Sequence, residues 1–123
     1  MTIRNKEVFI DNLWDWGFLD DCFGNTRIRV TDVDGLVERK GHFLLMETKS
    51  PGKDIPRGQA ILFDALASQP NWHVLVIWGE PNAPVSAQVW GCRPMMADMA
   101  KIREIVRRWY QYADGQSDHE VAA

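Results

Sequence analysis

Two apolar strand-like segments with a helical segment between them constrain the fold of this chain more than any other feature. Residues 72–79 read WHVLVIWG and are apolar at both odd and even positions, as expected of a strand covered on both faces. Residues 43–49, FLLMETK, form a second strand-like run, and the segment between the two opens a helix at Pro56 that continues to about Gln69. Strand, helix and strand in this order favour a parallel pair joined by a right-handed crossover. We therefore predict an α/β domain built on a parallel or mixed sheet.

The flanking segments supply the other elements of the predicted domain. Apolar residues at helical spacing predict a first helix over residues 3–14, and alternation predicts a strand over 27–38 that pairs with 43–49. Residues 85–92 predict a further short strand, and a last helix is expected to open at Pro94. The chain ends in polar or small residues, so we expect a single domain over residues 1–112 and a disordered tail over 113–123.

Composition excludes several classes of protein. The longest apolar run, Val74 to Trp78, is far too short to span a bilayer, and charges at Arg4, Lys6 and Glu7 stand where a signal peptide needs apolar residues. These features predict a cytoplasmic protein with no membrane partner. The two cysteines have no neighbouring Cys or His at the spacing of zinc ligands.

Acidic side chains and one lysine fall on a single face of the predicted hairpin. If Lys40-Gly41 is a two-residue turn, Asp34 lies opposite Glu47 and Asp32 lies opposite Lys49. Two carboxylates about 5 Å apart repel by about 3 kcal/mol at an effective dielectric constant of ~20. Phe43 and Leu45 precede them on the same face, so the charges need a physical reason. A positive group is expected between the two acids.

A divalent cation satisfies this requirement better than the lysine alone. Mg²⁺ prefers oxygen ligands, usually one or two carboxylates, together with water, a backbone carbonyl or substrate phosphate. Asp34 and Glu47 are the candidate carboxylate ligands, and the backbone carbonyl of Thr48 is a further candidate. A semi-buried ion-pair network, in which Asp32 pairs with Lys49, is the alternative explanation.

These residues resemble the signature of a known family. Asp34 followed by Glu47-Thr48-Lys49, directly after FLLM, is similar to the D…(D/E)-x-K motif of the PD-(D/E)XK nuclease superfamily. In the order of its elements the chain resembles the small archaeal Holliday-junction resolvases and stand-alone phage nucleases. The resemblance implies a restriction-endonuclease-like fold: a mixed sheet flanked by helices, with an αβββαβ core and a C-terminal helix.

The resemblance also implies Mg²⁺-dependent hydrolysis of DNA phosphodiester bonds, with Mn²⁺ as a possible substitute. Asp34 and Glu47 would hold the metal, and Lys49 would orient the attacking water or stabilise charge on the phosphate. Gln59, near the start of the second helix, would position water or backbone, and Glu7 would complete a second metal site.

Some features leave alternatives open. Val33, not proline, precedes Asp34, and Asp32 is a competing metal ligand on the same face. Gln59 also fits an ordinary side chain at a helix N-terminus, and Glu7 also fits a surface charge.

The net charge of −3 is unfavourable for a DNA partner, but its distribution is uneven, because residues 93–112 hold five basic and two acidic side chains. In the last predicted helix, Lys101, Arg103, Arg107 and Arg108 are candidates for contacts with DNA phosphates, although a solvated helix face explains them equally well. A homodimer, in which two basic strips share one substrate, is a further hypothesis. The alternatives to an enzyme are an idle nuclease-fold module that binds DNA or a protein, and a DNA mimic built on the acidic N-terminal segment.

Overall fold

The computed structural model describes residues 13–116, and contacts divide the chain into two compact units whose boundary in the sequence follows Asp32. In the first unit, residues 16–23 form a short 3₁₀ helix, η1 (Trp16–Phe23), which Asp15 caps by accepting a hydrogen bond from the Gly17 amide at 2.9 Å. Most of the predicted helix over residues 3–14 lies outside the described residues. Its predicted end is wrong, because residues 13–15 have no regular structure.

The second unit contains a five-stranded mixed sheet in the order β1-β2-β3-β4-β5. Its strands are β1 (Gly35–Arg39), β2 (His42–Lys49), β3 (Trp72–Glu80), β4 (Ala83–Val89) and β5 (Met95–Met96). The pair β2–β3 is parallel and the other neighbours are antiparallel. The α/β class and the mixed sheet predicted from the sequence are therefore confirmed.

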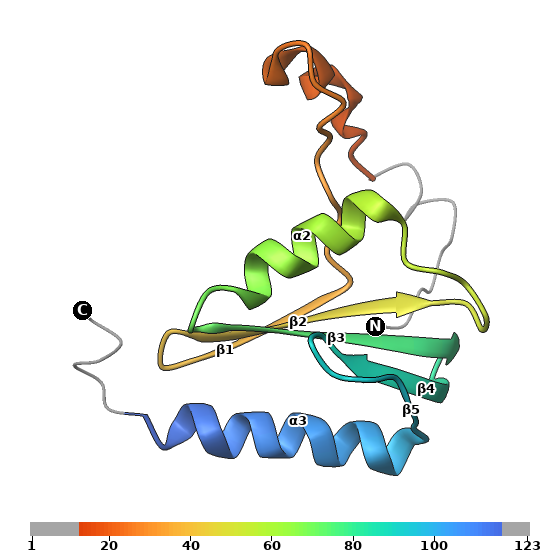
Figure 1. Ribbon diagram of the computed structural model, residues 1–123, viewed down its shortest axis with the longest axis vertical. Coiled ribbons are helices and arrows are strands. Elements are labelled where there is room, and N and C mark those ends of the chain that lie inside the picture. Colours follow the sequence, from red (N-terminus) through yellow and green to blue (C-terminus); the bar gives the residue numbers. More distant parts are fainter. Residues whose placement is uncertain (1–12, 117–123) are drawn as a thin grey trace. The chain divides into compact units, whose positions relative to one another are not determined.

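Two helices cover the sheet of the second unit, one on each face (Figure 1). Helix α2 (Arg57–Ala67) connects β2 to β3 and buries Phe63 against the face that carries Leu45 and Val76. Helix α3 (Met99–Asp114) packs Trp109 against the opposite face, around Leu75. Because β3 is covered on both sides, its central residues are apolar at every position, which explains the uninterrupted run in the sequence.

The strand predicted over residues 27–38 is shorter than expected. Only Gly35–Arg39 pairs with β2, and residues 27–33 have no regular structure. Alternation alone does not make a strand, because each ladder residue needs a partner, and the ladder between β1 and β2 ends at the pair Gly35↔Met46. Within residues 13–116 two strands, not three, precede α2, so the expected αβββαβ order is not what the described chain shows.

The last helix begins and ends later than predicted. Met95 and Met96 form β5 against β4, and α3 starts at Met99 because Asp98 caps it by accepting a hydrogen bond from the Lys101 amide at 2.9 Å. The helix continues to Asp114, so the prediction of a disordered tail from residue 113 is wrong for residues 113 and 114. Residues 117–123 lie outside the described part of the chain. Of the helices in residues 13–116, none is long and apolar enough to cross a membrane.

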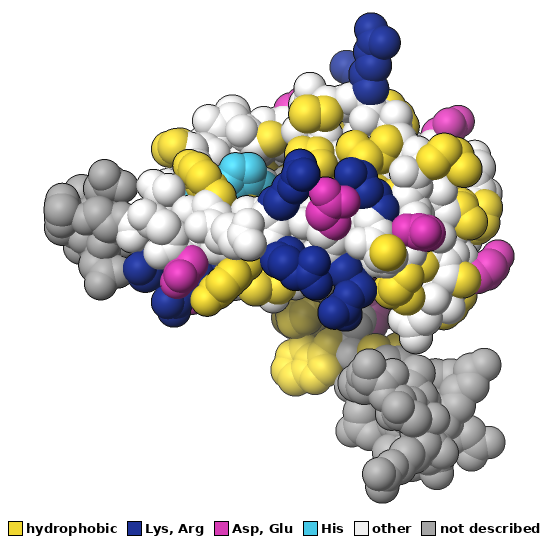
Figure 2. Space-filling model, turned by 90° about the horizontal axis from the view of Figure 1, so that it is seen from below, with side chains coloured by type: hydrophobic (Ala, Val, Ile, Leu, Met, Phe, Trp, Pro, Cys, Tyr) yellow, Lys and Arg dark blue, Asp and Glu magenta, His cyan; other side chains and the backbone are white. Residues whose placement is uncertain are grey.

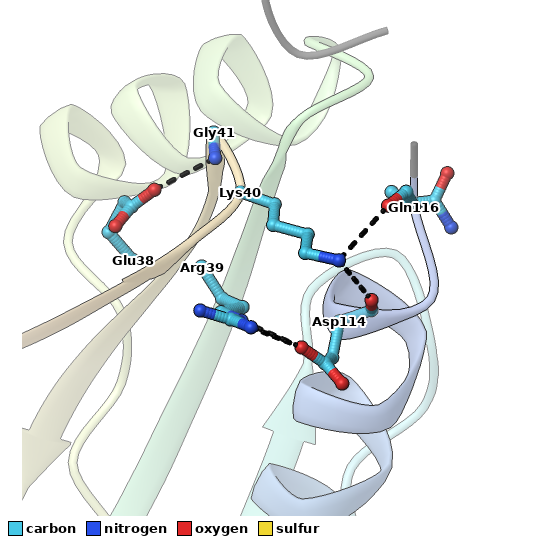
Figure 3. Close-up of polar contacts among 6 residues, drawn as sticks. All are labelled: Glu38, Arg39, Lys40, Gly41, Asp114 and Gln116. Carbon is cyan, nitrogen blue, oxygen red and sulfur yellow. Dashed lines mark hydrogen bonds and ion pairs between the residues drawn. The ribbon is translucent and has the colours of Figure 1, made fainter. Parts of the chain in front are cut away.

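The tip of the β1–β2 hairpin is attached to the C-terminal end of α3 (Figure 3). Arg39 donates to the Asp114 carboxylate at 2.6 and 2.8 Å. Lys40 Nζ donates to the backbone carbonyls of Asp114 at 2.8 Å and of Gln116 at 3.4 Å. Carbonyls at a helix C-terminus lack intrahelical partners and carry partial negative charge, so a lysine there stabilises the helix end.

Candidate active site

The register of the β1–β2 hairpin brings the two candidate carboxylates together. Lys40 and Gly41 have φ angles of 51° and 78°, as a two-residue hairpin turn with positive φ at both positions requires. Pairing runs from Arg39↔His42 to Gly35↔Met46, as predicted. Asp34 is the next residue, and it therefore reaches the level of Glu47 and Thr48 at the end of the ladder.

Asp34 is held against the edge of β2 by Thr48. Its Oδ2 atom accepts hydrogen bonds from the Thr48 amide at 2.9 Å and from Thr48 Oγ1 at 3.1 Å. The amide and carbonyl of one strand residue point toward the same neighbour, so the Thr48 carbonyl faces the same edge as the Asp34 carboxylate. Thr48 thus keeps Asp34 in place and presents one further oxygen beside it.

Glu47 is a buried carboxylate with only 7% of its surface exposed. Gln59 Nε2 donates to Glu47 Oε1 at 2.8 Å, and Lys49 Nζ lies 3.8 Å from the same oxygen. The pKa of Glu47 is raised above its usual value of 4.5, mainly because the group is buried. The negative charge of Asp34 also raises this pKa, whereas the hydrogen bond from Gln59 and the positive charge of Lys49 lower it. A cation near this pair would therefore be stabilised by both carboxylates.

Gln59 reaches this site from the first turn of α2. The turn begins after Pro56, whose φ of −59° suits a helix start. The Gln59 Oε1 atom is buried and has no hydrogen-bond partner within residues 13–116. A buried acceptor without a partner is costly, so this atom provides a place for a donor such as water.

Oxygen atoms from three groups could hold a hard cation: the carboxylates of Asp34 and Glu47 and the carbonyl of Thr48. This donor set fits Mg²⁺, which completes its octahedral shell with water or phosphate oxygens. The described residues hold no cluster of three or more His, Cys, Asp or Glu side chains suited to a metal. A metal here would be bound by two carboxylates and one carbonyl of the described residues, with the remaining positions open to water or substrate.

Asp32 and Glu7 are the two other acids predicted for the site. Asp32 precedes β1 and belongs to the first unit, so the predicted pairing of Asp32 with Lys49 in the ladder is wrong; β1 begins only at Gly35. The ion pair of Lys49 is instead with Glu47 on its own strand. Glu7 lies outside the described residues.

A pocket of about 520 Å³ opens at the carboxyl ends of β2 and β3, on the face of the sheet that α3 covers and not on the face that carries Glu47 and Gln59. Thr48 and Lys49 line it together with Glu80 at the end of β3 and with Met99 and Ile102 at the start of α3. Ligands bind preferentially at the carboxyl ends of parallel strands. Glu80 was not predicted as a lining residue, because only the β2–β3 register, Lys49↔Trp78, brings these strand ends together.

The four basic residues predicted to contact phosphates all lie on α3 and form two groups. Lys101 and Arg108 each pair with Glu104, at 3.3 and 3.0 Å. Arg103 and Arg107 are exposed and take part in no ion pair among residues 13–116.

Comparisons with family models, with curated proteins and with solved structures gave no match.

Proposed function

We propose that this protein is a Mg²⁺-dependent deoxyribonuclease that hydrolyses phosphodiester bonds with the restriction-endonuclease-like arrangement expected from the sequence. One observation carries the proposal: Asp34 and Glu47 meet at the end of the β1–β2 ladder, with Lys49 and Gln59 directly on Glu47. A structural ion pair alone does not require two carboxylates and a buried amide at one point. Two acids and an amine at one point suit attack on a phosphate diester.

Each residue has a distinct role in this proposal. Asp34 and Glu47 would hold Mg²⁺, which would supply Lewis-acid stabilisation of the phosphate and activation of water. Lys49, with three N–H donors, stabilises charge on the phosphoryl oxygens from its position beside Glu47. Gln59 fixes Glu47 through its Nε2 atom, and its free Oε1 atom accepts a hydrogen bond from the attacking water.

A cleavage assay tests the proposal. Linear, nicked, flapped and four-way DNAs are incubated with Mg²⁺, and wild type is compared with Glu47→Gln and Lys49→Met. Each variant is expected to lose at least 100-fold in rate, in line with about 10²–10³ for removal of one group that stabilises the transition state. Glu38→Gln at the far end of β1 is the matched control and should cleave like wild type, because its side chain only accepts a hydrogen bond from the Gly41 amide. Equal rates for wild type and both site variants would remove the proposal.

A second candidate is the idle nuclease-fold module, which binds DNA or a protein without cleavage. The observation in its favour is that Gln59 and Lys49 already satisfy the Glu47 carboxylate without a metal. Binding of DNA by wild type, with no cleavage of any DNA in the panel, would support it. The cytoplasmic location and the homodimer remain part of the main proposal, and light scattering tests the dimer.

A further inference from the structure

The exposed side of α3 carries a concentration of positive charge. Figure 2 shows Lys and Arg side chains gathered around an acidic one on the face of the molecule seen from below, where α3 lies. Lys101, Arg103, Arg107 and Arg108 are the basic residues of this helix, and Glu104 is the acid between them. The net charge of the whole chain is −3, so this surface is opposite in sign to the average.

Only part of this charge is neutralised within the helix. Glu104 binds both Lys101, at 3.3 Å, and Arg108, at 3.0 Å, so one acid is shared by two cations. Arg103 and Arg107 stand one turn apart with no acid of the described residues paired to either. Like charges at this spacing destabilise a helix, and an anionic partner would relieve their repulsion.

We propose that Arg103 and Arg107 form a contact surface for the phosphate backbone of DNA. The proposed function supplies DNA as the polyanion, so this inference rests on it. A guanidinium group carries N–H donors in a fork that matches phosphate oxygens, and both arginines are exposed. Tyr110, three residues after Arg107, is 47% exposed and adds an amphipathic ring beside them.

The start of α3 lies on the other face of the sheet from Glu47 and Lys49, beside the pocket at the carboxyl ends of β2 and β3. Met99 and Ile102 line the same pocket as Thr48 and Lys49. Arg103 follows Ile102 directly, and Arg107 lies about 6 Å further along the helix axis. The two arginines are therefore a DNA contact separate from the proposed catalytic residues.

Fluorescence anisotropy with a labelled 20-base-pair duplex, in EDTA so that no cleavage occurs, tests this inference. Neutralising both arginines, Arg103→Gln with Arg107→Gln, removes two phosphate contacts. The slope of log K against log salt should become shallower by about 1.8, and affinity at 0.1 M salt should fall by about 60-fold, since each contact contributes about 0.9 to the slope. Circular dichroism verifies that α3 is retained.

The matched control removes the same number of positive charges at Lys101 and Arg108, the two basic residues that pair with Glu104. Lys101→Gln with Arg108→Gln should weaken binding by no more than about 8-fold, because Glu104 leaves this group with one net positive charge. Glu104→Gln should instead tighten binding by about 8-fold, because it releases one net positive charge.

Equal losses in the two double variants would mean a general effect of net charge and would overturn the inference. Absence of measurable binding by wild type would also overturn it, and would favour an acidic protein as the partner of this face. Binding that depends on Arg103 and Arg107, without any Mg²⁺-dependent cleavage by wild type, would support the surface while removing the nuclease proposal.

Discussion

Replacing Glu47 by glutamine should stabilise the metal-free protein at neutral pH while abolishing its proposed activity. At 3.8 Å the attraction between Lys49 and Glu47 is about 4 kcal/mol at an effective dielectric constant of ~20. Repulsion from Asp34 opposes this attraction and affects the pKa of Glu47 more strongly than Lys49 does. The attraction of Lys49 therefore does not offset the cost of burying the Glu47 charge. Because the folded environment favours the neutral form of this side chain, the neutral amide should gain on the order of 1 kcal/mol.

The stability difference between Glu47→Gln and wild type should depend on pH. The folded-state pKa of Glu47 is raised, so below pH 4.5, the usual value of the group, both folded and unfolded chains are protonated and the carboxyl costs nothing. As the pH rises, the unfolded chain ionises first, and the free energy of unfolding decreases until the folded carboxyl has ionised too. The stability advantage of Glu47→Gln should therefore be near zero at pH 4 and reach its full size by pH 8.

Urea unfolding followed by tryptophan fluorescence, in EDTA at pH 4 and pH 8, measures this difference. The six tryptophans include Trp78 and Trp90, which pack on the α2 side of the sheet. An advantage that is the same at both pH values would refute the reasoning, as would a Glu47→Gln variant that is less stable than wild type at pH 8. Either result would mean that burial and Asp34 do not control this carboxyl.

Four further predictions concern the framework around the site. Phe63→Ala should lower the free energy of unfolding by about 3–5 kcal/mol in urea titrations, because the ring is 1% exposed beneath α2; a loss under 1 kcal/mol would contradict this packing. Burial and then the charge of His42 lower the pKa of His73, so stability should fall as the pH drops below 6.5, and His73→Phe should reduce that fall. A double-mutant cycle between Arg39 and Asp114 should give about 0.3–1 kcal/mol, decreasing in high salt, as expected for an exposed pair. Gly79→Ala should lower the melting temperature, because its Cβ would clash with the backbone oxygen of Ala83 in the β3–β4 hairpin; an unchanged melting temperature would contradict this packing.

The central part of the site was predictable from the sequence because it depends on local rules. A two-residue turn containing Gly41 fixes the hairpin register, and the strict alternation of a strand then places Glu47 and Lys49 on the face opposite Leu44. Gln59 was predicted to point inward from the spacing of the apolar residues in its helix, and it does contact Glu47.

The remaining features depend on contacts that a single sequence does not reveal. Apolar and polar residues alternate from Ile28 onward, yet β1 begins at Gly35, because only there does the chain gain a partner strand. Met95 fits a helix as well as a strand, and pairing with β4 decides in favour of β5. Glu104 stands three residues after Lys101 and four before Arg108, the spacings at which side chains on a helix pair. The sequence alone could therefore have separated these two paired basic residues from Arg103 and Arg107.

Calorimetric titration of Mn²⁺ into the metal-free protein tests the central claim most directly. If Asp34 and Glu47 share a cation, wild type binds Mn²⁺ with a stoichiometry of about one, and both Asp34→Asn and Glu47→Gln abolish the heat signal while Glu38→Gln retains it. Absence of Mn²⁺ binding by wild type, or undiminished binding by both site variants, would contradict the account.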